Sequence, residues 1–181
     1  MFDVKVNGYS GGVDHQQLIS ETLETWAKER PDLNFAAMGI GLKFDIIATA
    51  TMGLATEEIA DLGINLGEFD VLATLRRNGK NGVLTPTEIA SAAMVSPSGL
   101  THRLTQLEKM GHIIRQNDPN DRRSSLVRLT PHGRKIADQA IERISEHATQ
   151  LVSSFSADEV EVLNTALDKV LAVISQRLTA P

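Results

Sequence analysis

The hydrophobic positions of this chain recur mostly three or four residues apart, which is the spacing of one face of a helix. The helices expected from it cover residues 14–28 and 35–62, a segment that starts after Asn65, residues 131 to about 154, and a last segment that starts after Ser156. Two short runs, 112–116 and 125–129, are instead typical of strands. The pattern therefore predicts a mainly α protein with a small β element.

The segment 85–134 contains the most specific structural signals of the chain, which are helix starts and a change of hydrophobic period. Thr85 and Glu88 have the spacing of a capping box with Pro86 at the first helical position, so a short helix is expected to begin there. Ser96 before Pro97 predicts the start of a second helix. The leucines of this second helix recur at helical spacing and are expected to face the core: Leu100, Leu104 and Leu107.

The hydrophobic period changes after Gly111, which is expected to end the second helix in the left-handed conformation. The strands 112–116 and 125–129 then enclose a turn-forming loop that carries the adjacent Arg122 and Arg123. Two short strands with a basic tip form a wing. A capped helix, a recognition helix, a basic wing and a further helix in this order predict a winged helix-turn-helix with a two-stranded β wing.

The remaining segments predict a division of the chain into three regions. Residues 1–13 contain three glycines without a clear period and are expected to form a flexible N-terminal arm. Residues 65–130 are expected to form a winged helix-turn-helix DNA-binding domain. Residues 14–64 and 131–181 form a helical dimerisation region, because the apolar stripe of the long second helix is wide and the last helix has a near-heptad apolar seam.

The charge distribution favours a nucleic-acid partner although the whole chain carries a net charge of −5. Residues 100–135 contain eight Lys and Arg against three acidic residues, whereas the remainder contains 10 basic and 20 acidic residues. A basic patch on an acidic body is typical of a DNA reader. The plainer alternative is a solvated charged loop.

Composition excludes several other classes of protein. The chain has no cysteine, which excludes disulfides, thiolate metal sites and cysteine-based redox sensing. Its five histidines are scattered, so neither a metal site nor a catalytic constellation is indicated, and we expect no enzyme activity and no cofactor. The sequence shows no uninterrupted apolar run of membrane-spanning length and no secretory signal, which predicts a cytoplasmic protein.

The chemistry of individual side chains predicts how DNA is contacted. Short polar groups at the start and on the outer face of the recognition helix suit phosphates and base edges: Ser96, Ser98, Thr101, His102, Thr105 and Gln106. Arg122 and Arg123 are expected to enter the adjacent minor groove. A dimer would place two recognition helices, each with its wing, on an inverted repeat with half-sites about 34–36 Å apart.

The same segment resembles the MarR family of bacterial transcription regulators. The resemblance is carried by Leu104, Leu107-Glu108 and Gly111, and then by Asp118-Pro119, Asp121-Arg122-Arg123, Val127-Arg128-Leu129-Thr130-Pro131 and Gly133. It extends over residues 14–178 and implies an all-α homodimer with a small wing on each subunit. It also implies that Asp121 orients the wing by pairing with Arg123. Ordinary turn chemistry is an alternative role for Asp121.

A finer resemblance concerns a ligand. The expected first helix and the run Gly67-Glu68-Phe69-Asp70-Val71-Leu72-Ala73 are similar to the urate-responsive subgroup of this family. That resemblance implies a ligand site of Trp26, Asp70, Arg103 and Arg115. Two guanidinium groups suit a planar anion, which Trp26 could stack on or enclose. Each residue also has a structural alternative: a core anchor for Trp26, an ion pair between Asp70 and Arg103, and a phosphate contact for Arg115.

Together these observations predict a regulator, most simply a repressor, that binds a palindromic operator as a homodimer and is released by a small anion such as urate. In the predicted switch, the ligand pulls on the recognition helix and the wing, and the two reading heads lose their spacing. Two alternatives stay open. One is a winged-helix module that binds another protein, and the other is a DNA-binding regulator without a small-molecule effector.

Overall fold

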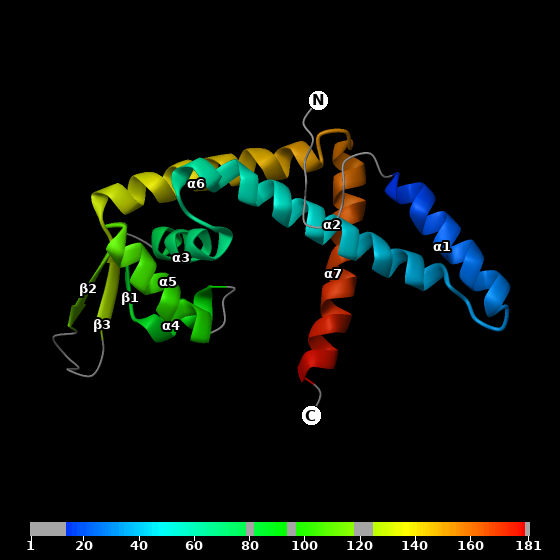
Figure 1. Cartoon of the computed structure of the whole chain (residues 1–181), viewed down its shortest axis with the longest axis horizontal. Helices are drawn as coiled ribbons and strands as arrows, with labels where there is room; N and C mark the ends of the chain where they lie inside the picture. Colours follow the sequence, from blue (N-terminus) through cyan, green and yellow to red (C-terminus); the bar gives the residue numbers. More distant parts are fainter. Residues whose placement is uncertain (1–13, 79–81, 94–96, 118–124, 180–181) are drawn as a thin grey trace. The chain divides into compact units, whose positions relative to one another are not determined.

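The computed structural model describes residues 14–78, 82–93, 97–117 and 125–179. They divide into two compact units, one reaching to Ile141 and the other starting at Glu142. Helix α6 (Pro131–Leu151) begins in the first unit and ends in the second. The first unit holds all the other elements except the last helix, α7 (Ala157–Thr179), and Figure 1 labels the helices and strands.

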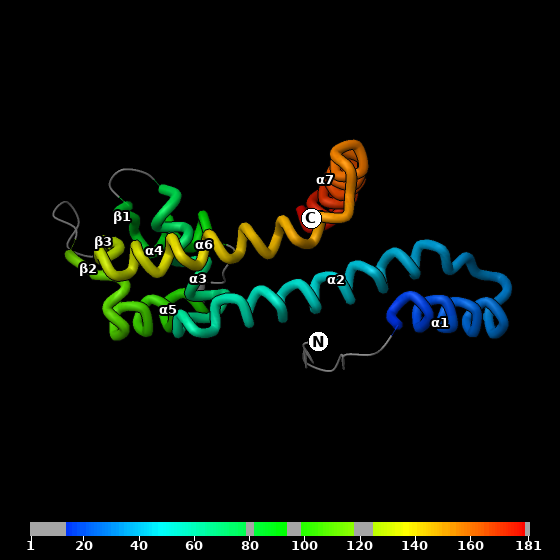
Figure 2. The backbone as a smooth tube through the Cα atoms, turned by 90° about the horizontal axis from the view of Figure 1, so that it is seen from above, coloured from blue at the N-terminus to red at the C-terminus, as the bar shows by residue number. Residues whose placement is uncertain are grey.

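The N-terminal part of the first unit is a pair of helices. Helix α1 (His15–Glu29) is capped by Asp14, whose carboxylate accepts hydrogen bonds from the backbone N–H groups of the next turn. It packs beside the N-terminal half of α2 (Ala36–Ile59), while the other end of α2 leads to the winged part (Figures 1 and 2). The long helix predicted over residues 35–62 is therefore an α-helix that ends at Ile59 and a 3₁₀ turn, η1 (Ala60–Leu62).

The winged part contains three helices and a small sheet. Its elements are α3 (Leu66–Arg77), β1 (Val83–Leu84), α4 (Pro86–Ala92), α5 (Pro97–Lys109), β2 (Ile113–Asn117) and β3 (Ser125–Leu129). The sheet is antiparallel with strand order β1-β3-β2. The mainly helical winged fold is thus confirmed, but the wing has a third strand that the sequence analysis missed.

Local start and stop signals form as predicted. The capping box of Thr85 with Glu88 begins α4, and that of Asn65 with Glu68 begins α3. Gly111 ends α5 with a φ of 74°, in the left-handed region where a residue without a Cβ is unstrained. These interactions satisfy the backbone groups that a helix end leaves without partners.

The core of the first unit lies between α3, α4, α5 and the sheet. Side chains from each of these elements are fully or almost fully buried there: Val71, Leu72, Leu75, Ile89, Leu100, Leu104, Leu107, Ile113 and Val127. The start of α6 joins this core through Ile136, Ala137 and Ala140. An ion pair of 2.6 Å between Arg76 and Asp138 links α3 to α6 at the surface. The winged part therefore buries its own apolar residues within one chain.

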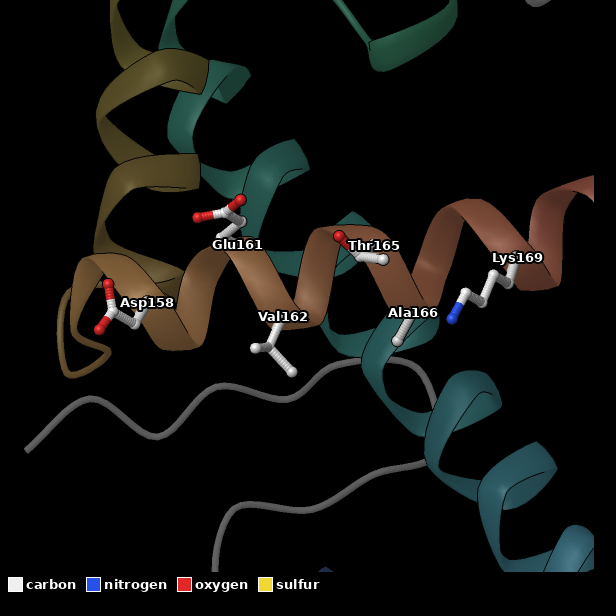
Figure 3. A pocket seen from close by; sticks show the side chains of 6 residues that line it. All are labelled: Asp158, Glu161, Val162, Thr165, Ala166 and Lys169. Atoms are coloured by element: carbon white, nitrogen blue, oxygen red, sulfur yellow. The ribbon is translucent and has the colours of Figure 1, made fainter.

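Helix α7 in the second unit differs from this core. It begins at a capping box in which the Glu159 carboxylate accepts from the Ser156 backbone N–H at 2.8 Å. Every described residue of α7 is at least partly exposed, including the apolar Val162, Leu171 and Leu178. Figure 3 shows a shallow hollow along this helix, where Val162 and Ala166 lie between Asp158 and Lys169.

Helix α2 also leaves large apolar side chains exposed, among them Ile40, Ile47 and Met52. With η1 it forms the one segment among the described residues, Ala36–Leu62, that is long and apolar enough to cross a membrane by length and composition. The sequence pattern had predicted no such segment. This is weak support for a membrane span, because Lys43 and Asp45 lie within it and charged side chains are costly in hydrocarbon.

Candidate nucleic-acid interface and effector site

Helix α5 presents one face to the core and another to the outside. Leu100, Leu104 and Leu107 are 3%, 2% and 0% exposed, as predicted for the inner face of a recognition helix. On the outer side, Thr101 and His102 are exposed, and Thr105 and Gln106 are half-buried. The packing of the leucines fixes which side chains of α5 face outward, and these are mainly polar.

Not every predicted DNA contact can be placed. Ser98 lies in the first turn of α5. Ser96 and the predicted wing-tip residues Asp121, Arg122 and Arg123 lie outside the described residues. The DNA contacts predicted for all of these residues, and for the outer face of α5, stay predictions.

Thr105 has partners within the chain. Its hydroxyl donates to the backbone carbonyl of Thr101 at 2.9 Å and accepts from the Nη2 of Arg115 at 2.9 Å. A hydroxyl has one proton to donate and two lone pairs, so one acceptor position remains for another group. Thr105 thus joins the recognition helix to the wing in addition to its predicted DNA contact.

Arg115 projects from β2 to two residues of α5. Besides its bond to Thr105, its Nε lies 3.1 Å from a carboxylate oxygen of Glu108. The Arg115 side chain is 26% exposed and that of Glu108 is 44% exposed. The sequence analysis assigned no role to Glu108, and no signal in the sequence points to this contact because it depends on how β2 packs against α5.

Arg103 lies on a different side of α5, against the first turn of α3. A Cβ atom added to Gly67 would be 2.6 Å from the Arg103 Cζ and 2.7 Å from its Nη2, so this guanidinium occupies the space that a side chain at position 67 would fill. Its Nη1 is buried without a hydrogen-bond partner among the described residues. Asp70, which is half-buried, follows Gly67 by three residues and so shares that face of α3.

The contacts of the two predicted ligand arginines lie on different flanks of α5. Arg103 packs on the face of α3 that carries Asp70, while Arg115 contacts the flank of α5 formed by Thr105 and Glu108. At 100° per residue, these two flanks of α5 are separated by roughly 170° around the helix axis. That the four residues share one ligand stays a prediction.

Trp26 lies farther away. Its ring stacks on Phe35, with ring centroids 6.0 Å apart, at the N-terminal end of α2. Helix α2 has 24 residues and is thus about 36 Å long, and α3 follows its opposite end. Figures 1 and 2 both show α1 at the end of α2 that is remote from α3 and α5. Trp26 is 45% exposed, so it is not a buried core anchor.

Comparisons with known proteins agree with this fold. A sequence model described as the MarR family matches residues 64–125. The chain is 31% identical over 152 residues to the HTH-type transcriptional regulator PecS of Dickeya dadantii (strain 3937), with 84% of this chain and 92% of PecS covered. PecS is a transcriptional regulator rather than an enzyme, which agrees with the absence of enzyme activity expected from the sequence.

Solved structures give the same result. A mutant of MarR from E. coli complexed with operator DNA matches with a TM-score of 0.65 and 29% identity, over 76% of this chain and 96% of that one. BpsR of Bordetella bronchiseptica, described with a mechanism for regulation of its DNA binding by 6-hydroxynicotinic acid, matches with a TM-score of 0.62 and 20% identity, over 72% and 97%. At that identity BpsR supports the fold alone.

Proposed function

The chain belongs to the MarR family of DNA-binding transcription regulators, and from this premise we propose that it binds an inverted-repeat operator as a homodimer and is released by a small anionic effector such as urate. We propose a repressor, because release by an effector then switches transcription on. A regulator of this kind acts on the chromosome, so we place it in the cytoplasm. The division into a winged DNA-binding part and a helical dimerisation part is included in the proposal.

The observation that carries DNA binding is the arrangement of α5. Its leucines are buried by the chain's own core, and this leaves Thr101 and His102 exposed on the opposite side. The stretch 100–135, which contains most of this helix, carries the excess of positive charge along the sequence. Polar groups on an outward helix face read base edges, while neighbouring cations neutralise phosphates. The structural similarity to MarR bound to operator DNA supports the same use of this helix.

Dimerisation is supported by the apolar side chains that each unit leaves uncovered. Ile47 and Met52 of α2 are 60% and 62% exposed, and Val162 of α7 is 71% exposed. Exposed apolar surface of this extent on long helices is typical of protein interfaces. We therefore assign α1, α2, the second half of α6 and α7 to contacts with a second copy of the chain.

Two guanidinium groups support an anionic effector. Arg103 has a buried N–H group without a partner among the described residues, and the Nε of Arg115 faces Glu108 at 3.1 Å without the geometry of a hydrogen bond. Such groups gain from a planar anion that accepts two hydrogen bonds. Urate remains the candidate that the resemblance to the urate-responsive subgroup suggests.

The position of Trp26 adds a condition to this proposal. A complete site needs an aromatic ring near Asp70 and Arg103, but within one chain Trp26 is at the far end of α2. We therefore propose that the partner's Trp26 completes the site, which makes effector binding a property of the dimer.

Mixed dimers test this directly. Trp26→Phe and Arg103→Gln homodimers should each lose effector binding, measured by titration calorimetry with urate. A mixed dimer of the two variants should regain one site per dimer, because one pocket then combines an intact Trp26 with an intact Arg103 from the other chain. A mixed dimer without any site would contradict sharing between subunits.

The proposed function as a whole is tested by operator release. Fluorescence anisotropy of a labelled duplex from the DNA flanking the chain's own gene should show tight binding that weakens when urate is added. Because coupling between two sites is reciprocal, operator DNA must weaken urate binding by the same factor. Equal urate affinity with and without operator would rule out the switch, and a flat salt dependence would favour a protein-binding module over a DNA reader.

A further inference from the structure

Arg115 is the point where the wing is attached to the recognition helix. It leaves the middle of β2, whose register pairs it with Val127 of β3, and it reaches across to α5. There its guanidinium meets Thr105 at 2.9 Å and Glu108 at 3.1 Å. One side chain of the wing is therefore held by two side chains of the helix that is expected to read DNA.

The two partners on α5 suit this role. Thr105 and Glu108 are three residues apart and so lie on the same flank of the helix. The Thr105 hydroxyl is itself fixed, because it donates to the Thr101 carbonyl one turn earlier. Glu108 supplies a full negative charge at 3.1 Å from the Arg115 Nε, and it attracts the guanidinium as an ion pair, because this Nε has no hydrogen-bond partner among the described residues. Together they restrain the direction in which Arg115, and with it β2, can move relative to α5.

We propose that Glu108 is a positioning residue for operator binding: its carboxylate holds the Arg115 guanidinium, keeps the wing in register with α5, and competes with the anionic effector for that guanidinium. The second half of this inference rests on the proposed function. In the chain without effector, Glu108 occupies Arg115 and the wing is set for DNA. An anion that takes over Arg115 displaces Glu108, and the wing loses its attachment to the recognition helix.

Whether operator affinity rises or falls when Glu108 is neutralised tests this proposal. A carboxylate on a DNA-reading helix repels phosphates, so if it were merely a surface charge its removal would raise operator affinity. If Glu108 positions the wing, its removal lowers operator affinity although a negative charge has been taken away. For the effector the expectation is the reverse, because removing the internal competitor leaves Arg115 available.

The experiment compares wild type, Glu108→Gln and the control Asp138→Asn, which removes an equal charge from the partly exposed ion pair between Asp138 of α6 and Arg76 of α3. Operator affinity is measured by anisotropy at constant salt, and urate affinity by calorimetry without DNA. We expect Glu108→Gln to bind operator about fivefold more weakly and urate about fivefold more tightly, with Asp138→Asn unchanged in both. The thermal midpoint should stay the same in both variants, because a partly exposed ion pair contributes little to stability.

A double-mutant cycle with Arg115→Gln identifies the contact responsible. In the Arg115→Gln background, Glu108→Gln should no longer lower operator affinity and should show only the small gain from reduced repulsion. Unchanged or higher operator affinity of Glu108→Gln in the wild-type background would overturn the positioning role. A loss of equal size in both backgrounds would overturn the role of Arg115 in it.

The two proposals fail in different ways. If wild type does not bind urate, the effector proposed above is wrong, while the operator measurements still decide whether Glu108 positions the wing. If wild type binds and responds to urate but Glu108→Gln leaves urate affinity unchanged, the competition is wrong and the proposed function stands.

Discussion

Helices α5 and α7 have similar amphipathic sequences but opposite surroundings. The apolar face of α5 is covered by its own chain, with Leu104 and Leu107 at 2% and 0% exposure. The apolar residues of α7 are uncovered, with Leu171 and Leu178 at 59% and 80% exposure. Burial of apolar area is the main favourable term in folding and association, so the first helix is stabilised by folding and the second needs another surface. A regular hydrophobic pattern identifies a helix, but not whether its cover is the same chain or a second copy.

The largest expected effect is on the free energy of unfolding, when a buried leucine of α5 is truncated. Leu104→Ala removes a buried side chain and should lower the free energy of unfolding by about 2–5 kcal/mol, because a cavity remains. Gln176→Ala, on the side of α7 away from Ile174, should change it by less than about 0.5 kcal/mol. Denaturant titration measures both. A small loss for Leu104→Ala would mean that α5 is not packed as described.

The next largest expected effect is on dimerisation, through the exposed apolar residues of α7. Ile174→Asp places a charge in the apolar seam of α7 and should separate the dimer, with operator binding about a hundredfold weaker because two linked heads become single ones. Gln176→Asp adds the same charge roughly 160° further around the helix and should leave the dimer intact. Sedimentation velocity gives the oligomeric state. An Ile174→Asp protein that stays dimeric would exclude this face from the interface.

A smaller effect is expected on urate affinity when the position of Arg103 is changed. Gly67→Ala places a Cβ where the Arg103 guanidinium now lies, and the flexible arginine side chain must move away. Alanine is the better helix former by about 1 kcal/mol, so thermal stability should stay equal or rise. Urate affinity should nevertheless fall about tenfold, because Arg103 is displaced. Full urate affinity in Gly67→Ala would remove Arg103, in its present position, from the effector site.

The smallest expected effect is a pH dependence. Burial of His112, together with His132 at a ring-centroid distance of 5.0 Å, lowers the His112 pKa, while Glu68 opposes this. The folded protein therefore binds a proton at His112 less readily than the unfolded chain. Stability should be unaffected well above the unfolded pKa of about 6.5 and fall as the pH decreases below it, by at most about 1.4 kcal/mol per pH unit.

The control for this prediction is His112→Gln, in which the part of the pH dependence due to His112 should disappear. Urea denaturation at pH values between 5 and 8 compares the two proteins. An equal slope in both would show that the acid sensitivity comes from other groups.

Local signals in the sequence predicted most of the elements. The capping boxes at Thr85 and Asn65 and the left-handed Gly111 depend on residues within one turn, so they can be recognised without knowing the tertiary structure. The short strand β1 was missed because two residues carry no period. It exists only through pairing with β3, which lies more than 40 residues later in the chain.

The candidate site was harder to predict for the same reason. Residue types at Trp26, Asp70, Arg103 and Arg115 suggested an anion site, but their distances depend on packing between helices and, in the proposed dimer, on a second subunit. The contact of Arg103 with Gly67 and that of Arg115 with Glu108 are tertiary. A glycine within the first turn of α3 was the one available hint, because glycine is a poor helix former and its presence there calls for a close neighbour.

In the proposed complex, two copies of the chain bind one operator through α5 and the wing. The most direct test is the number of chains bound to a single inverted-repeat duplex, measured by native mass spectrometry or by analytical ultracentrifugation of labelled DNA. We expect two chains per duplex, and much weaker binding to a duplex that carries only one half-site. A single chain bound with full affinity, or equal affinity for the half-site, would contradict it.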